Sequence, residues 1–172
     1  SGVIVAFGQP AWAPWLAPAA AICGYALFWH AISKEASPKY RFLLSTGWFA
    51  AVQLVQLSWM TSIEYQGVYI LAVYGLVAVA LGLQFGVLTH MIGRIPLVAS
   101  ASLWALIEWS RVHVLCGFSF NPVGLALTAL PFSLQTVSFF GIFGLSFWVI
   151  LTNLALWKKK WMPKSFIRQA RI

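Results

Sequence analysis

The stretch that decides the fold is "VYILAVYGLVAVALGLQFGVLTHMI", residues Val68–Ile92, which contains no charged residue. A helix needs about 20 apolar residues to cross the ~30 Å hydrocarbon core of a bilayer, so this stretch is long enough to span one. The hydrocarbon core offers backbone groups no water to bond, and a spanning chain therefore folds as helices or a closed barrel. No alternating strand pattern competes here. The stretch predicts a transmembrane helix.

The composition of the whole chain agrees with a membrane protein. Of the 172 residues, 61% are hydrophobic and 8% are charged, whereas a soluble domain carries about a quarter charged residues. Ten Trp and five Tyr fit rings that settle near lipid headgroups. The net charge of +8 lies in short basic clusters between apolar runs. Such placement indicates membrane topology, and we expect no nucleic-acid partner.

The remaining apolar segments predict an all-α, polytopic membrane helix bundle over residues 1–172. We expect about five full spans at residues 15–32, 42–60, 68–92, 97–116 and 132–157. Residues 3–8 are too short to cross a bilayer, and we interpret them as the end of a truncated first span. The chain is thus expected to be a fragment of a longer protein.

Charged loops predict how these spans are oriented. Three loops are basic: Lys34–Arg41, Arg94 and Lys158–Lys164. The alternate loops hold Glu64 or, at Gly117–Pro131, no charge at all. The positive-inside rule therefore places the basic loops in the cytoplasm and the others outside.

The stretch "LWALIEWSRVHVLCGFSF", Leu103–Phe120, carries charge inside an apolar span. At 1.5 Å per residue, Glu108 lies roughly 17 Å above Leu97 and Arg111 roughly 21 Å. A central charge costs about 2.5 to 3.5 kcal/mol on insertion scales. Helical spacing brings both side chains and Trp104 to one face. Two interpretations stay open: a structural ion pair between helices, or a polar patch lining an outward cavity where Arg111 meets an anionic headgroup.

Small residues at helical spacing predict close helix packing. One set lies in the 68–92 span and the other in the last span: Gly75, Ala78, Gly82, Gly86 and Gly93; Gly141 and Gly144. Such a seam lets another helix approach closely. A groove for an acyl chain is the alternative interpretation.

The remaining reactive residue types predict no chemistry. Cys23 and Cys116 lie far apart, without metal or redox spacing, and are expected to be small buried residues. No carboxylate stands at triad spacing from His30, His90 or His113. We predict no catalytic residue, metal site or cofactor in this chain.

Several segments resemble apolipoprotein N-acyltransferases. "ASLWALIEWSRVHVLCGFSF" resembles the family segment A-L-W-x-x-x-E-x-x-R-x-x-x-x-x-G-F-P-W, and "FFGIFGLSFWVILTNLAL" resembles its G-x-x-G-x-S-F run. "STGWFAAVQLVQLSWMTS" is similar to a family span that ends in Trp, and "AFGQPAW" resembles the proline turn after the first span. The resemblance covers nearly the whole chain in order.

The resemblance implies a bacterial inner-membrane enzyme. The family transfers an acyl chain from a phospholipid donor to the N-terminal cysteine of an apolipoprotein, through a thioester on a nitrilase-like periplasmic domain. Nothing like that domain is present here, so this chain is not expected to be active alone. The matching positions imply a substrate or lipid cavity near Trp104, Glu108, Arg111, Gly117 and Phe120.

Three positions differ from the family pattern, and two other functions remain as alternatives. Ser119 stands where the family has Pro, Phe120 where it has Trp, and Cys116 where it has Thr. Cys116 has no nearby base and is not expected to be a nucleophile. The alternative functions are a small multipass transporter or lipid-handling protein and a purely structural membrane subunit.

Overall fold

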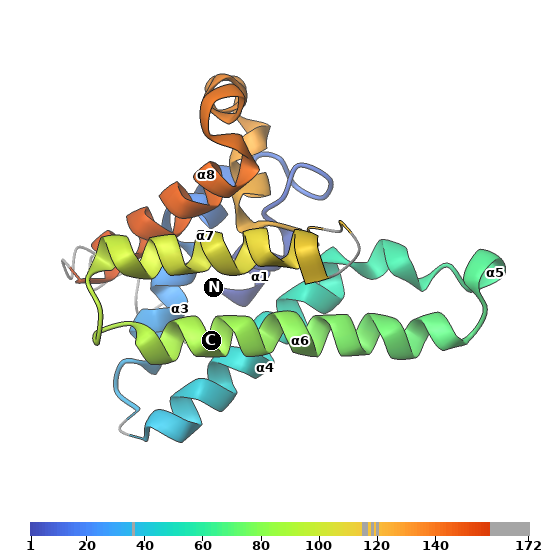
Figure 1. The fold of residues 1–172 in the computed structure, drawn as a ribbon, viewed down its shortest axis with the longest axis horizontal. Helices are drawn as coiled ribbons and strands as arrows, with labels where there is room; N and C mark the ends of the chain where they lie inside the picture. The colour runs from blue at the N-terminus through green and yellow to red at the C-terminus, as the bar shows by residue number, and fades with distance from the viewer. Residues whose placement is uncertain (36, 115–116, 118, 120, 159–172) are drawn as a thin grey trace.

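A computed structural model describes residues 1–35, 37–114, 117, 119 and 121–158. These residues form helices joined by turns (Figure 1), without a strand among them, so the all-α prediction is confirmed for the part described. In chain order the elements are α1 (Gly2–Phe7), α2 (Ala17–Ala19), the π-helix η1 (Ala20–Gly24), α3 (Tyr25–Ile32), α4 (Pro38–Gln56), the 3-10 helix η2 (Ser58–Thr61), α5 (Ile63–Gln66), α6 (Tyr69–Met91), α7 (Leu97–Val114), the 3-10 helix η3 (Val123–Ala129) and α8 (Pro131–Lys158).

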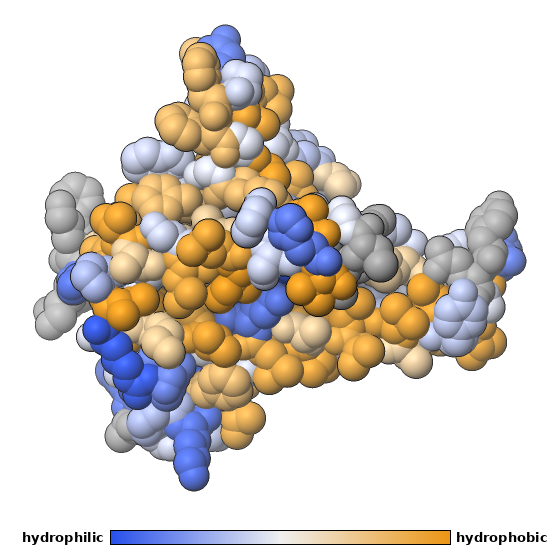
Figure 2. All heavy atoms as spheres, viewed as in Figure 1, coloured by the Kyte–Doolittle hydropathy of each residue, from blue (hydrophilic) through white to orange (hydrophobic). Residues whose placement is uncertain are grey.

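Two described helices, α6 and α8, are long and apolar enough to cross a membrane. Only 33% of the most apolar window of each is buried. Large apolar side chains therefore point outward, as with Leu76 at 70% exposed and Phe139 at 84%. Figure 2 shows this apolar surface along α6. Apolar area on this scale is unfavourable in water and suits contact with lipid. The number of spans stays a prediction.

The apolar run at residues 15–32 is not one regular α-helix. Its middle, η1, has the wider π-helical turn, which removes α-helical backbone bonds. Asn153 of α8 supplies the missing partners: its Oδ1 accepts from Tyr25 N at 3.0 Å and Ala26 N at 2.9 Å. Its Nδ2 donates to Ala21 O at 2.6 Å. A fully buried amide of α8 thus holds the irregular turn in place.

Helix α8 is broken at Gly141, where φ is 65° and ψ is −178°. Residues with a Cβ avoid this conformation, so the glycine changes the helix direction that Figure 1 shows. The packing role expected for Gly141 and Gly144 is wrong. A Cβ at Gly141 would meet no atom within 4 Å, and one at Gly144 would first meet Phe140 of the same helix.

The other set of small residues packs α6 against α4. A Cβ at Gly82 would lie 2.4 Å from Thr46 O, and one at Gly86 would lie 2.4 Å from Thr46 Oγ1. The seam prediction is confirmed at these two positions. It is wrong at Gly75, which has open space, and at Gly93, which has φ 90° in the turn after α6.

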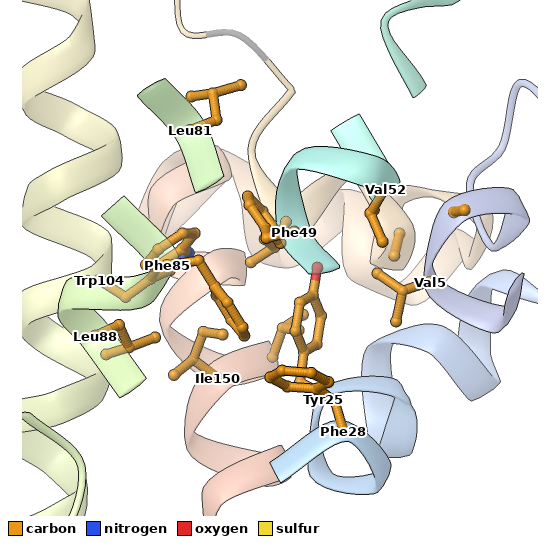
Figure 3. Packing of buried hydrophobic residues seen from close by; sticks show 14 of the residues in the cluster. Val5, Tyr25, Phe28, Phe49, Val52, Leu81, Phe85, Leu88, Trp104 and Ile150 are labelled. Atoms are coloured by element: carbon orange, nitrogen blue, oxygen red, sulfur yellow. The ribbon is translucent and has the colours of Figure 1, made fainter. Parts of the chain in front are cut away.

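An aromatic cluster forms the core of the bundle (Figure 3). Phe85 of α6 is fully buried and stacks on Phe49 of α4, with ring centroids 4.8 Å apart. Trp104 of α7 meets Phe85 edge to face at 5.8 Å. Tyr25 of α3 contacts both phenylalanines. Aromatic contacts of this kind join four helices at one level and fix the position of α7.

Candidate functional site

Helix α7 brings three of the five predicted site residues to one buried face. Trp104 and Glu108 are 0% exposed and Arg111 is 2% exposed. The indole Nε1 of Trp104 donates to Glu108 Oε1 at 2.9 Å. Positions four residues apart lie one above the other on a helix, which is why the sequence spacing alone pointed to this contact.

The Glu108 carboxylate also holds the loop that follows α7. Its Oε1 accepts the backbone N–H of Val123, the first residue of η3, at 2.9 Å. The next N–H, that of Gly124, donates to Ser146 Oγ of α8 at 3.0 Å. The first N–H groups of a helix lack partners within it. Glu108 and Ser146 supply those partners from two neighbouring helices.

Close packing accompanies these bonds. A Cβ at Gly124 would lie 2.6 Å from Ile142 O and 2.7 Å from Ser146 N, so only glycine lets η3 lie this near to α8. Val123 and Gly124 are both buried. The carboxylate is therefore the anchor of a tightly packed loop.

Arg111 joins α7 to α6. Its Nε donates to Gln84 Oε1 at 2.7 Å, and its guanidinium carbon lies 5.4 Å from the centroid of the Trp104 ring. The ring face attracts a cation at this distance. Because the side chain is almost completely buried, a direct meeting with a headgroup would require this face of α7 to open, and that interpretation stays a prediction. The geometry favours a positioning role for Arg111.

A second group of polar side chains continues from the same loop. Asn121 Nδ2 donates to Gln53 Oε1 at 3.2 Å and to Gln56 Oε1. Gln56 Nε2 donates to the Val5 carbonyl of α1 at 2.7 Å. This chain of bonds links the loop to α4 and α1. Asn121 itself has a positive φ of 50°.

A cavity of about 460 Å³ opens beside these residues. Its lining is mostly apolar, and Ser119 and Asn121 are the two polar side chains among the lining residues. The apolar lining residues are Leu57, Trp59, Pro122, Leu125 and Ile142. Asn121 and Pro122 directly precede Val123, whose N–H bonds to Glu108. The three buried α7 residues are not part of the lining. Of the three, Glu108 bonds directly to the loop, through the N–H of Val123 that follows the lining residue Pro122.

The other predicted positions contribute less. Gly117 has φ 87°, a conformation that favours glycine, and its N–H donates to Val112 O at 2.9 Å where α7 ends. Phe120 and Cys116 lie outside the described residues. Cys23 is half-buried, and its thiol donates to Ala19 O at 3.2 Å. Within the residues described, no group of three His, Cys, Asp or Glu side chains could hold a metal ion.

Sequence reasoning missed five polar residues that the structure makes central: Gln53, Gln56, Gln84, Ser146 and Asn153. Each stands inside an apolar run, and Gln53, Ser146 and Asn153 are almost completely buried. A polar residue within a predicted span was the available signal, because such residues face the bundle and pair with one another. Their long-range partners lie 22 to 132 positions away in the chain and were not visible.

A comparison with protein families identifies a match over most of the chain. Residues 1–155 match the family described as "Apolipoprotein N-acyltransferase N-terminal domain".

Similar proteins carry the corresponding name. A Chlamydia caviae apolipoprotein N-acyltransferase is 29% identical over 170 residues, which cover 92% of this chain and 31% of the relative. The Chlamydia trachomatis and Chlamydia muridarum proteins of the same name are 30% and 31% identical over 177 residues, which cover 96% of this chain and 33% of each relative. The chain thus spans about a third of the length of these relatives. No solved structure matches it.

Proposed function

This chain belongs to the apolipoprotein N-acyltransferase N-terminal domain family, and we propose that it is the membrane part of a lipoprotein N-acyltransferase. The whole enzyme would move an acyl chain from a phospholipid to the N-terminal cysteine of an apolipoprotein. One ester bond of the phospholipid breaks, an amide bond to the cysteine α-amino group forms, and the amine proton passes to the lysophospholipid oxygen. The catalytic groups would lie in the two thirds of the relatives that this chain does not match.

The cavity beside η3 carries the proposal for this part of the protein. Its volume of about 460 Å³ lies within the range of ligand sites, ~300–1,000 Å³. Apolar side chains suit an acyl chain, and the polar groups of Ser119 and Asn121 suit the ester region. Glu108, Ser146 and the two glutamines of α4 keep the wall at Asn121–Val123 in place. The segment would admit lipid here and anchor the catalytic domain.

We further propose the orientation that the loop charges predict. Lys34–Arg41, Arg94 and Lys158–Lys164 would face the cytoplasm, and Glu64 and Gly117–Pro131 the periplasm, in a bacterial inner membrane. The N-terminal end of α4 and the turn that holds Arg94 meet, and Arg41 and Arg94 line one cavity there, which supports a common side for the two basic loops. The cavity beside η3 would then open toward the periplasm.

The test is complementation with the full-length protein. A bacterium depleted of its own lipoprotein N-acyltransferase would express the complete gene that contains this chain. Mass spectrometry of a reporter lipoprotein is expected to show an acyl group on its N-terminal cysteine nitrogen. An unacylated amine, with the protein present in the membrane at normal level, would overturn the proposal.

Two substitutions distinguish the effect of filling the cavity from a general effect on folding. Leu125→Trp fills the cavity and is expected to lower acylation at normal protein yield, because Leu125 lines the space. Leu76→Trp, at an exposed position of α6, is the matched control and should leave acylation unchanged. Equal acylation by both variants would show that lipid does not enter through this cavity.

The break in α8 is the observation that favours the alternative, a transporter, since transporters often bind substrate at broken helices. Gly141 itself is exposed, with open space around it. Family membership outweighs this feature, and the complementation result decides between the two functions.

A further inference from the structure

A pair of further cavities lies at the other end of α4 from the cavity proposed for acyl transfer. It occupies the junction of the α4 N-terminus, the α6 C-terminus and the turn that leads to α7. Figure 2 shows hydrophilic side chains gathered at the end of the molecule where Figure 1 places these turns, next to the apolar surface of α6. One cavity is lined mostly by apolar side chains and the other by polar and basic ones, and the two share lining residues.

The larger cavity is a groove of about 500 Å³ between α4 and α6. Its walls are apolar side chains of both helices, Phe42, Leu43, Val87 and Met91, and Lys39 stands at its edge. Leu43 is 62% exposed and Val87 42% exposed, so the groove is open on its outer side. Its volume and apolar lining suit an acyl chain.

The smaller cavity, about 280 Å³, is polar and cationic. Arg41 of α4, Arg94 of the turn and Thr89 of α6 contribute to its wall. Arg94 is held in place because its Nη1 donates to His90 O at 2.9 Å. Pro38 and His90 line both cavities, so the cationic space and the apolar groove are adjacent.

Glu35 is the described acidic residue that lies nearest to this group of charges in sequence. Glu35 precedes α4, and its Oε1 accepts the backbone N–H of Ser37 at 3.2 Å. Three basic side chains, Lys39, Arg41 and Arg94, line these two adjacent cavities and outnumber this one acidic residue. A soluble anion would leave the groove unused, and a neutral lipid would leave the charges unused.

We propose that this junction binds one anionic phospholipid, with the phosphate in the cationic cavity and an acyl chain along the groove between α4 and α6. Basic pockets between membrane helices recognise anionic headgroups, and each Lys or Arg near the lipid surface contributes about a five-fold gain in affinity. The lipid is a bound component that fastens the two helices together. It is not the acyl donor, because it lies at the other end of the bundle.

The test uses the full-length protein, purified in detergent and titrated with dioleoyl phosphatidylglycerol or dioleoyl phosphatidylcholine. Native mass spectrometry counts the bound lipid. The wild type is expected to bind the anionic lipid at least ten-fold more tightly than the neutral one. Arg41→Gln with Arg94→Gln should weaken that binding by roughly 30-fold, the effect of two basic side chains. Equal affinity for the two lipids would overturn the proposal.

Two further variants identify the occupant. Val87→Trp fills the groove and is expected to weaken phosphatidylglycerol binding without changing any charge. Lys34→Ala removes a charge from the same loop outside both cavities and should have no effect. Unchanged lipid binding in Val87→Trp, or full displacement of the lipid by millimolar inorganic phosphate, would assign the site to a soluble phosphate and overturn the lipid proposal.

The outcome is independent of the acyltransferase proposal. Reporter acylation is measured on the same variants in phosphatidylglycerol-containing membranes, and Arg41→Gln should retain it because Arg41 lies far from η3 in the bundle. Loss of lipid binding with retained acylation supports a separate site. Should Arg94→Gln lower the folded yield, Arg41→Gln alone is expected to show the single-charge effect of about five-fold.

Discussion

Replacing Glu108 by alanine tests whether the carboxylate positions the cavity wall. The change removes the acceptor of two buried donors, Trp104 Nε1 and Val123 N, each at 2.9 Å. An orphaned buried donor costs about 1–3 kcal/mol, although hydrogen bonds between membrane helices average nearer ~0.6 kcal/mol. The two donors together therefore predict a loss of about 2–4 kcal/mol in the free energy of unfolding. For a chain of this size that lowers Tm by roughly 5–15 °C.

Matched variants give this prediction its sharpness. Glu108→Gln keeps an oxygen that can accept both N–H groups, so it is expected to lose at most about 1 kcal/mol. Ser146→Ala removes the acceptor of Gly124 N and the longer bond from Ser146 Oγ to Ile142 O at 3.3 Å, and it should cost about 1 kcal/mol. Glu64→Ala, at an exposed residue, should change nothing. We therefore expect the highest Tm for Glu64→Ala and the lowest for Glu108→Ala. Glu108→Gln and Ser146→Ala should have similar Tm values between these two.

Hydrogen exchange locates the effect. In Glu108→Ala the amide of Val123 is expected to exchange at least ten-fold faster than in the wild type, the equivalent of about 1.4 kcal/mol in local opening. In Ser146→Ala the faster amide should be that of Gly124. If Glu108→Ala melts with the wild type and η3 stays protected, the carboxylate does not hold the loop. Equal losses in the Ala and Gln variants would show that charge, rather than the acceptor oxygen, is what matters.

Three other substitutions test the fold. Asn153→Leu keeps the side-chain volume but leaves Tyr25 N and Ala26 N without their acceptor. We expect the free energy of unfolding in detergent to fall by about 2–4 kcal/mol. Gln135→Leu, on the exposed face of α8, is the neutral control. Gly82→Ala places a Cβ 2.4 Å from Thr46 O and should destabilise by about 1–3 kcal/mol, whereas Gly75→Ala, with open space, should be neutral or slightly stabilising by the same thermal assay; equal effects would contradict the seam. Gly141→Ala forces a Cβ into φ 65° and should cost about 1–3 kcal/mol, and circular dichroism that shows added helix with an unchanged Tm would mean that the break is not required.

The sequence predicted the features that depend on neighbours along the chain. Apolar length indicated helices, and helical spacing brought Trp104 to Glu108, a contact that needs only one turn of α7. The repeat of small residues found Gly82 and Gly86, since both lie on one face of a single helix. Motif order found the family. Each of these signals is local, and local geometry is nearly fixed once a segment is helical.

Only the tertiary structure decided which distant groups complete these elements. The partner of Glu108 across the bundle is a backbone N–H of Val123, and that of Arg111 is Gln84, 27 positions earlier. The π-turn at Ala20–Gly24 persists because Asn153 accepts its freed N–H groups. Backbone groups in an apolar interior must find a partner somewhere, but sequence order does not say where. Packing of the helices brings that partner close. For Glu108, whose role the sequence left open, the partner is the Val123 N–H of the loop beside the cavity.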